Sequence, residues 1–245
     1  MKTCILYGAS GHLGSQIRAD LLVEGWNVIG ISRKQAEFSD SAYVHLVLDL
    51  QEDSKSFILS ALEDALDYRS LDGVIFNASK MPDKADYAQD HDDSRFVRTC
   101  TGMLGNHLQL ASYLLPLLSR EASCIFISSM YSIVAPEPSI YDSTIPVIPP
   151  LYGALKSSLN QIARTYSSLY ACRGIRFNSI SYGPFPSAKV QDLSPSFIDR
   201  LASKTHLKRV GNMSDVSGPV LFLLSSQSTY ITGHNLVVDG GWTAS

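Results

Sequence analysis

The feature that most constrains the fold is a glycine turn placed between an apolar run and an amphipathic helix. Residues 3–7 are largely apolar, Gly8, Gly11 and Gly14 follow, and apolar residues then recur at helical spacing as far as Leu21. Glycines at this place permit a tight turn and let the backbone approach a diphosphate at a helix N-terminus. Helix-capping glycines would give the same triplet, but its position between a strand and a helix favours a dinucleotide site.

The rest of the chain continues this alternation of strand-like and helical patterns, which predicts β–α–β units and a parallel sheet covered on both faces. With right-handed crossovers, the result is a doubly wound, Rossmann-like α/β fold of about seven strands in a single domain, residues 1–245. The expected strands are residues 3–7, 26–31, 43–48, 72–77, 123–128, 174–180 and 234–239. The expected helices are residues 12–24, 53–67, 93–119, 151–171 and 215–225, with a short helical pattern at 197–204.

Two proline-rich stretches interrupt the alternation. Residues 132–150 contain five prolines and cannot form a long helix, and residues 183–196 contain three. Long loops in a compact domain are usually lids or binding loops. Because ligands bind beyond the carboxyl ends of parallel strands, we expect the site where small or polar residues follow the predicted strands. Those residues include Gly8, Ser32, Asp49, Asn77, Ser129 and Gly183.

Charge and composition exclude several classes of protein. A formal net charge of -3 leaves no basic footprint for nucleic acid. No apolar run approaches the roughly 18 residues of a membrane span, and the first apolar run is broken at Gly8, which argues against a signal peptide. The four cysteines are dispersed, without the spacing of a metal site. We therefore expect free thiols, no bound metal and a cytoplasmic protein.

Tyr152 and Lys156 lie four residues apart in a helical pattern and so share one helix face. A nearby ammonium favours phenolate and lowers the pKa of a tyrosine from its usual value of about 10. Such a tyrosine can exchange a proton with an alcohol or a carbonyl near neutral pH. The same pair also arises by chance on surface helices, so it gains its weight from the glycine turn and from Ser128 and Ser129 upstream.

Taken in order, these motifs resemble the short-chain dehydrogenase/reductase family, from residue 3 to residue 242. The resemblance implies a Rossmann fold, NAD(P) binding, a small-molecule substrate, and a homodimer or homotetramer built on helices 93–119 and 151–171. Besides the glycine turn and the Tyr152/Lys156 pair, it rests on Asp49-Leu50, residues 71–78, Ser129, residues 176–184 and residues 231–242.

The resemblance also implies roles for single residues. Tyr152 corresponds to the proton donor and acceptor, and Lys156 to the residue that lowers its pKa and holds the nicotinamide ribose. Ser129, rather than Ser128, matches the serine that orients the substrate oxygen. The residues expected to line the cofactor are Gly8, Ser10, Gly11, His12, Leu13 and Gly14 in the glycine turn, Asp49 and Leu50 at the adenine, Asn77 and Ala78 at the adenosine ribose, and Phe185 and Ser187 at the carboxamide.

The sequence departs from the family pattern at several positions. His12 stands at the second family glycine, so that Gly11 gives the G-x-x-G-x-x-G spacing of the longer sugar-nucleotide branch. Met103 aligns with the family's proton-relay asparagine, and Asn106 lies one helix turn away. Tyr182 replaces a proline after the sixth strand. The resemblance therefore covers the catalytic serine, tyrosine and lysine but not the asparagine.

The end of the second strand bears on the choice of cofactor. Ser32 lies 18 residues after Gly14, where an acidic residue would bind the 2′-hydroxyl of NAD. Arg33 and Lys34 follow, and an arginine there can hold the 2′-phosphate of NADP. We therefore expect NADP(H) to be favoured over NAD(H), with Ser32 and Arg33 at the adenosine ribose. A solvated basic turn is the other interpretation.

The segment between Ser129 and Tyr152 is longer than in most family members, and it resembles that of reductases linked to surface-glycan and flagellin modification. Its hydroxyl and carboxylate side chains suit a polar, sugar-like substrate, so we expect this segment to shape the substrate pocket. Glu137 and Asp142 are either substrate contacts or solvated loop carboxylates.

Three functions compete. The first is an NADP(H)-dependent reductase or dehydrogenase that interconverts a carbonyl and an alcohol on a small polar substrate. The second is a sugar epimerase or dehydratase that retains its cofactor; the glycine spacing and the long loop favour it, and a chain of 245 residues opposes it. The third is a non-catalytic cofactor-binding protein, which the intact Ser129, Tyr152 and Lys156 oppose.

Overall fold

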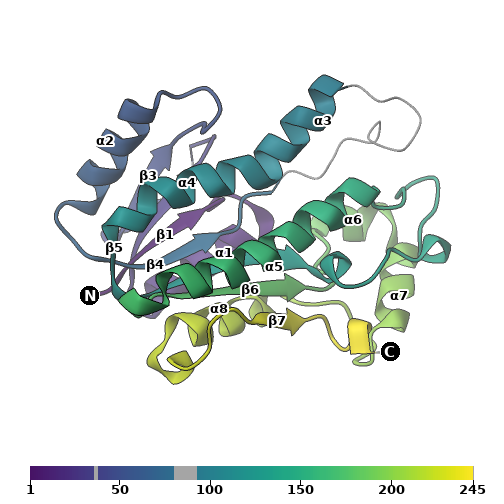
Figure 1. Ribbon diagram of the computed structural model, residues 1–245. Helices are drawn as coiled ribbons and strands as arrows, with labels where there is room; N and C mark the ends of the chain where they lie inside the picture. The colour runs from purple at the N-terminus through teal and green to yellow at the C-terminus, as the bar shows by residue number, and fades with distance from the viewer. Residues whose placement is uncertain (36–37, 80–92, 245) are drawn as a thin grey trace.

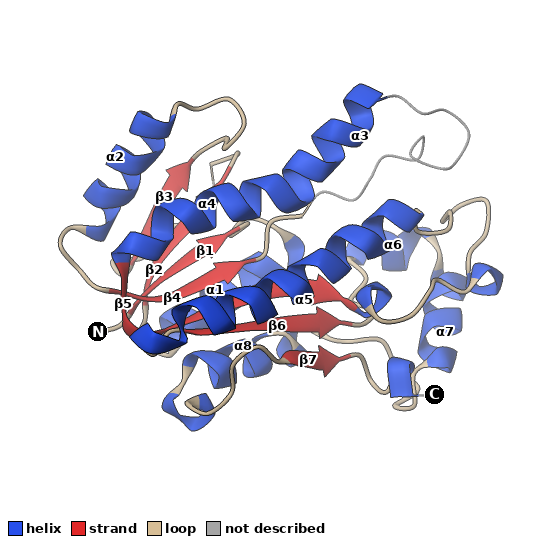
Figure 2. Ribbon diagram, in the orientation of Figure 1, coloured by secondary structure: helices blue, strands red, loops and turns tan. Residues whose placement is uncertain are grey.

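In the computed structural model, which describes residues 1–35, 38–79 and 93–244, seven parallel strands form one sheet (Figure 2). Their order across the sheet is β3-β2-β1-β4-β5-β6-β7, which confirms the predicted doubly wound α/β fold. The strands are β1 (Thr3–Tyr7), β2 (Asn27–Ser32), β3 (Tyr43–Val47), β4 (Leu71–Phe76), β5 (Leu118–Ser129), β6 (Arg176–Tyr182) and β7 (Asn235–Val238).

Helices cover both faces of this sheet (Figure 1). On one face lie α2 (Lys55–Leu66), α4 (Asn106–Leu114) and α5 (Pro150–Tyr170), and on the other α1 (His12–Val23) and α8 (Ser217–Leu224). Three further helices lie outside these two layers, namely α3 (Asp93–Cys100), α6 (Ala188–Leu193) and α7 (Pro195–Lys204). Among the described residues, no helix combines the length and the apolar character that crossing a bilayer requires.

Two apolar cores, one on each face, hold the layers together because successive side chains of a strand point to opposite faces. In β5, Cys124 and Phe126 belong to the core under α2, α4 and α5, whereas Ile125 and Ile127 belong to the core under α1 and α8. Both sets are almost completely buried, so β5 reads as a continuous apolar run, as expected for a strand covered on both sides.

The predicted helix over 93–119 is wrong in its continuity and in its end. A π-helical turn, Thr101–Gly105, separates α3 from α4, and α4 ends at Leu114 before a short 3₁₀ turn. Pro116 explains this end, because proline lacks an N–H donor and clashes with the preceding helical turn. Strand β5 then begins at Leu118, five residues before its predicted start. Residues 183–196, predicted to be irregular, contain α6.

A third, smaller apolar cluster lies beyond the carboxyl ends of β5 and β6. It joins Met130 and Ile140 of the loop after β5 to Phe197 and Leu201 of α7 and to Trp242. Residues 130–149 contain only short 3₁₀ turns, which confirms that they do not form a long helix. We call residues 130–149, together with α6, α7 and Trp242, the cap.

Candidate active site

A cavity of about 900 Å³ opens at the carboxyl ends of β1, β2, β4, β5 and β6. Most of the residues predicted to form the site line it, whereas Gly14 and Ser187 are not among the lining residues. The predicted residues on its wall are Gly8, Ser10, Gly11, His12, Leu13, Ser32, Arg33, Asp49, Leu50, Asn77, Ala78, Ser129, Tyr152, Lys156 and Phe185.

The glycine turn is packed so closely that two of its positions have no room for a side chain. Gly8 has a φ of +90°, and a Cβ there would lie 2.6 Å from the backbone nitrogen of Ala78. A Cβ on Gly14 would collide with the carbonyl oxygen of Gly8, which also accepts a 3.0 Å hydrogen bond from Asn77 Nδ2. Gly14 therefore shapes the turn from beneath, even though it does not line the cavity.

The N-terminus of α1 faces this cavity through His12 and Leu13. Its N-cap is Gly11, which makes no side-chain cap, so the free N–H groups of the first turn have no side-chain acceptor from that position. Such a terminus attracts anions. The tight glycine turn and the open helix end together fit the diphosphate of a dinucleotide.

The three predicted catalytic residues meet at the other end of the cavity. Ser129 ends β5 and is buried, while Tyr152 and Lys156 lie one turn apart in α5. Lys156 Nζ lies 5.8 Å from the centroid of the Tyr152 ring and donates a 2.9 Å hydrogen bond to the carbonyl oxygen of Ile127. Ser128 instead donates to the carbonyl oxygen of Lys156 at 2.9 Å and so ties β5 to α5.

Burial controls the electrostatics of this trio. It raises the pKa of Tyr152, and a hydrogen bond with Ser129 partly opposes the rise. Burial also lowers the pKa of Lys156 to about 8. Burial therefore holds the pKa of Tyr152 above its usual value in this structure, and the expected lowering of that pKa by Lys156 stays a prediction.

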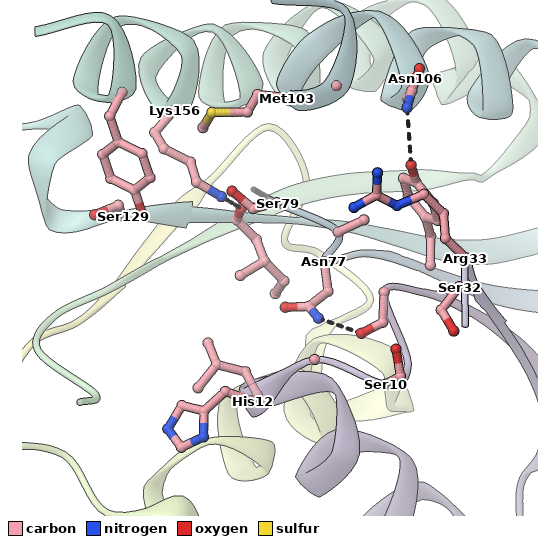
Figure 3. Close-up of a pocket in the computed structure, with 18 of the residues that line it drawn as sticks. Ser10, His12, Ser32, Arg33, Asn77, Ser79, Met103, Asn106, Ser129 and Lys156 are labelled. Atoms are coloured by element: carbon pink, nitrogen blue, oxygen red, sulfur yellow. Dashed lines mark hydrogen bonds between the residues drawn. The ribbon is translucent and has the colours of Figure 1, made fainter. Parts of the chain in front are cut away.

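The opposite end of the cavity is formed by the tips of β2 and β3. Ser32 Oγ donates to the carbonyl oxygen of Lys34 at 2.8 Å, and His45 Nε2 lies 3.0 Å from that oxygen and 3.0 Å from Ser32 Oγ. A carbonyl only accepts, so Nε2 carries a proton and Nδ1 is free to accept from the Tyr43 hydroxyl, 2.5 Å away. This network fixes the turn that presents the exposed Arg33 to the cavity (Figure 3).

Met103, which aligns with the family's relay asparagine, and Asn106, one helix turn away, both line the cavity. Met103 is buried in the π-helical turn. Asn106 does not extend toward Lys156; its Nδ2 donates to the Tyr7 hydroxyl at 3.4 Å, as Figure 3 shows. Neither side chain makes a hydrogen bond to Lys156 in the part of the chain that the structure describes.

The long segment after Ser129 does not contribute to the wall of this cavity. Glu137 pairs with Lys204 at 2.7 Å, and Asp142 pairs with Arg200 at 2.5 Å, so both carboxylates bind α7. Tyr131 and Tyr141 share a hydrogen bond within the cap. The two carboxylates considered as substrate contacts are thus paired with basic side chains of α7.

One wall of the cavity lay outside the residues proposed from the sequence. It is a single face of α3, the π-helical turn and the start of α4, on which lining residues recur at helical spacing. They are Arg95, Arg98, Thr99, Gly102, Met103 and Asn106. Other lining residues outside the proposed set are Tyr7, Lys34, Gln51, Ser79, Ile127, Ser128, Tyr182 and Gly183. The three- and four-residue spacing along α3 was the available signal.

Comparisons with known proteins agree with this geometry. The sequence model of a family described as enoyl-(acyl carrier protein) reductase matches residues 25–243. A tropinone reductase homologue of Arabidopsis thaliana is 34% identical over 139 residues, which are 56% of this chain and 49% of that protein. Glucose 1-dehydrogenase of Gluconobacter oxydans is 38% identical over 98 residues, 38% of this chain and 35% of that one. The chain thus spans half or less of the length of these relatives.

Solved structures match over nearly the whole chain. A short-chain dehydrogenase from Leptospira borgpetersenii with bound NAD+ has a TM-score of 0.85 at 27% identity, and the match covers 99% of this chain and 92% of that one. A short chain dehydrogenase family protein from Francisella tularensis has a TM-score of 0.83 at 21% identity with full coverage of both chains, which shows a shared fold.

Proposed function

Because the chain belongs to the short-chain dehydrogenase/reductase family, an oxidoreductase family that binds nicotinamide cofactors, we propose that it is an NADP(H)-dependent oxidoreductase. It would interconvert a carbonyl and an alcohol on a small polar, sugar-like substrate, within one Rossmann-fold domain of residues 1–245. The observation that carries this proposal is that Ser129, Tyr152 and Lys156 share one cavity with the glycine turn and the N-terminus of α1.

The proposed roles of the three residues follow from their chemistry. The nicotinamide, when bound, supplies or accepts a hydride at the substrate carbon. The Tyr152 hydroxyl would exchange a proton with the substrate oxygen, and Ser129 Oγ would donate a hydrogen bond that stabilises negative charge developing there. Lys156 Nζ donates one of its three N–H groups to the carbonyl oxygen of Ile127, so two remain to bind the ribose hydroxyls. Its positive charge would favour the phenolate form of Tyr152.

The preference for NADP(H) rests on the end of β2. Arg33 is exposed, lines the cavity and follows directly on Ser32, so that no carboxylate stands at the place that would select a free 2′-hydroxyl. Arg33 can instead make charge-assisted hydrogen bonds to a 2′-phosphate. The NAD+ in the Leptospira borgpetersenii structure identifies a nicotinamide nucleotide as the class of ligand for this fold.

The proposal of a small polar, sugar-like substrate draws on the name of one relative, glucose 1-dehydrogenase, while others are named tropinone reductase homologues. The same cavity is also lined by Tyr182, Phe185 and Met103, so apolar surface accompanies the polar groups of Ser129 and Tyr152. The likeness of the segment after Ser129 to glycan-modifying reductases adds no support, because its carboxylates pair with α7.

We include a homodimer or homotetramer in this proposal. Exposed apolar side chains occur on the helices expected at the interface, namely Phe96 and Val97 on α3, Leu108 on α4 and Leu169 on α5. Burying such side chains between subunits would remove apolar surface from water. Light scattering coupled to size exclusion would give the mass directly, and a monomer at micromolar concentration would contradict this part.

A spectrophotometric screen tests the proposed activity. NADPH absorbance is followed while purified protein is offered small ketones and keto-sugars, and the reverse reaction is followed with NADP+ and the matching alcohols. Stoichiometric loss of NADPH with formation of the alcohol is the expected result. Conversion of a sugar without net loss of NADPH, or binding of NADPH without turnover on any compound, would overturn it.

A further inference from the structure

The face of α3 that lines the cavity carries two arginines. Arg95 and Arg98 are three residues apart, and Gly102 and Asn106 continue the same face at spacings of four. Residues with this spacing lie one above another on a helix. The arginines therefore line the same cavity as the glycine turn and Arg33.

Cationic side chains outnumber carboxylates on the described part of this wall. Among the residues that the structure describes, the lining includes five cationic side chains and one carboxylate, although the formal net charge of the protein is -3. The carboxylate is Asp49, whose Oδ1 accepts a 3.0 Å hydrogen bond from the backbone of Gln51. Like charges gathered in a cleft create a potential that favours an anion. The five cations are Arg33, Lys34, Arg95, Arg98 and Lys156.

The position of Gly102 indicates which end of the cavity is nearest to Arg98. Gly102 lies one helical turn after Arg98, and an added Cβ there would be 3.6 Å from Gln51 Nε2, in the turn after β3. Gln51, Asp49 and Arg33 all line the cavity at the tips of β2 and β3. Because Arg98 and Gly102 share one helix face, we assign Arg98 to this adenosine end of the cavity and not to the end that holds Ser129 and Tyr152.

Neither Arg33 nor Arg98 makes a hydrogen bond or an ion pair with the residues that the structure describes, and both side chains are exposed. Their turns are nevertheless fixed, Arg33 by the Ser32–His45–Lys34 hydrogen bonds and Arg98 by its helix. Both guanidinium groups line one cleft, and a phosphate dianion offers three acceptor oxygens, enough to accept hydrogen bonds from two arginines.

We infer that Arg98 forms the second half of a clamp on the 2′-phosphate of NADP(H), opposite Arg33. The inference rests on the proposed function, because it concerns the same cofactor site. It adds a selectivity residue from α3, some 65 positions along the chain from the β2 tip. Discrimination between NADP(H) and NAD(H) then depends on both walls of the cleft.

The test uses two nucleotides that differ only in the group at issue, 2′,5′-ADP and 5′-AMP, titrated by calorimetry against the full chain. The parent protein should bind 2′,5′-ADP more tightly. Arg98→Ala should weaken 2′,5′-ADP by about 10- to 100-fold, as expected for loss of a charge-assisted contact, and leave 5′-AMP within about twofold. Arg33→Ala should act in the same way, and the double variant should bind the two nucleotides equally.

Arg164→Ala is the matched control, because Arg164 is an exposed arginine of α5 outside the cavity, and it should change neither affinity. Equal binding of both nucleotides by the parent would overturn the NADP(H) preference and the clamp together. A parent preference that Arg33→Ala abolishes and Arg98→Ala leaves intact would overturn the clamp alone. Equal weakening of both nucleotides by Arg98→Ala would place Arg98 on the adenosine and also contradict the inference.

Discussion

The glycine turn and the cap both lie beyond the carboxyl ends of the sheet but are held together in different ways. The turn is fixed by backbone packing: Gly8 lies against Ala78, and Gly14 lies against the carbonyl of Gly8. The cap is fixed by a small apolar cluster and by two half-exposed ion pairs between segments about 60 residues apart. Backbone packing tolerates no side chain, whereas exposed ion pairs contribute little individually. The glycine turn should therefore be intolerant of substitution, and the cap should be more tolerant of it.

The largest expected effect is at Tyr152, the residue proposed to transfer the proton. Tyr152→Phe removes only the hydroxyl that would carry the proton, so kcat should fall by about 10²- to 10⁴-fold. The affinity for NADPH should stay within about twofold, because the glycine turn is untouched. Steady-state kinetics on the best substrate from the screen and NADPH fluorescence titration measure the two quantities. Retention of more than a tenth of the activity would refute proton transfer by Tyr152.

The second prediction concerns a substitution within the glycine turn. Gly14→Ala forces a methyl group into the carbonyl of Gly8, and relief of this clash must open the turn. NADPH affinity should fall by more than about 100-fold, or the protein should unfold at a clearly lower temperature. Gly218→Ala is the matched control in α8, since its added Cβ meets nothing within 4 Å; it should bind NADPH normally. Normal binding by Gly14→Ala would remove the contrast between the regions.

A third variant tests how much the buried Lys156 ammonium lowers the free energy of unfolding. Burial lowers the pKa of Lys156 from 10.5 to about 8, so the folded protein disfavours the charged form by an amount on the order of 3 kcal/mol. This penalty is full below pH 8 and disappears as the pH rises to about 10.5. Lys156→Met should therefore be inactive yet more stable at pH 7, by on the order of 1 to 3 kcal/mol in denaturant unfolding. A less stable variant would contradict the assigned cost.

The smallest effect is expected in the cap. The hydrogen bond from Lys204 lowers the pKa of Glu137. The hydrogen bond from the backbone N–H of Ile145, together with that from Arg200, lowers the pKa of Asp142. The pairs therefore contribute above the ordinary carboxyl range and are lost as the pH falls below about 4. In a Trp26→Phe background, the fluorescence of Trp242 should shift in that acid range. Adding Glu137→Gln and Asp142→Asn should abolish the shift and leave NADPH affinity unchanged.

The fold could be predicted wherever the sequence carried an apolar period. Most strands were placed within two or three residues because their runs are apolar and bounded by turn residues. The start of β5 was missed because Ser119, Arg120 and Glu121 are polar and carry no strand signal. The helix before it was extended too far because its leucines keep their spacing through Pro116.

The residues of the candidate site could likewise be predicted where the signal is local and not where it depends on the tertiary fold. Gly8, Tyr152 and Lys156 follow from short spacings, because a turn and one helix face are local geometry. The pairing of Glu137 with Lys204 joins residues 67 positions apart, and no local pattern announces it. Arg98 is not predicted for a related reason: its helix face follows from the sequence, but its place on the wall of the cavity is set only by the folded sheet.

The π-helical turn at Thr101–Gly105 separates chain length from the face that α3 presents to the cleft. Its i→i+5 hydrogen bonds hold about one residue more per turn than those of an α-helix, so the additional residue is taken up within the turn itself. Loss of a single residue there would restore regular winding and leave the Arg95–Arg98 face toward the cleft. Loss of a residue within the regular winding of α4 would instead rotate α3 by about 100° and carry both arginines away from the cleft.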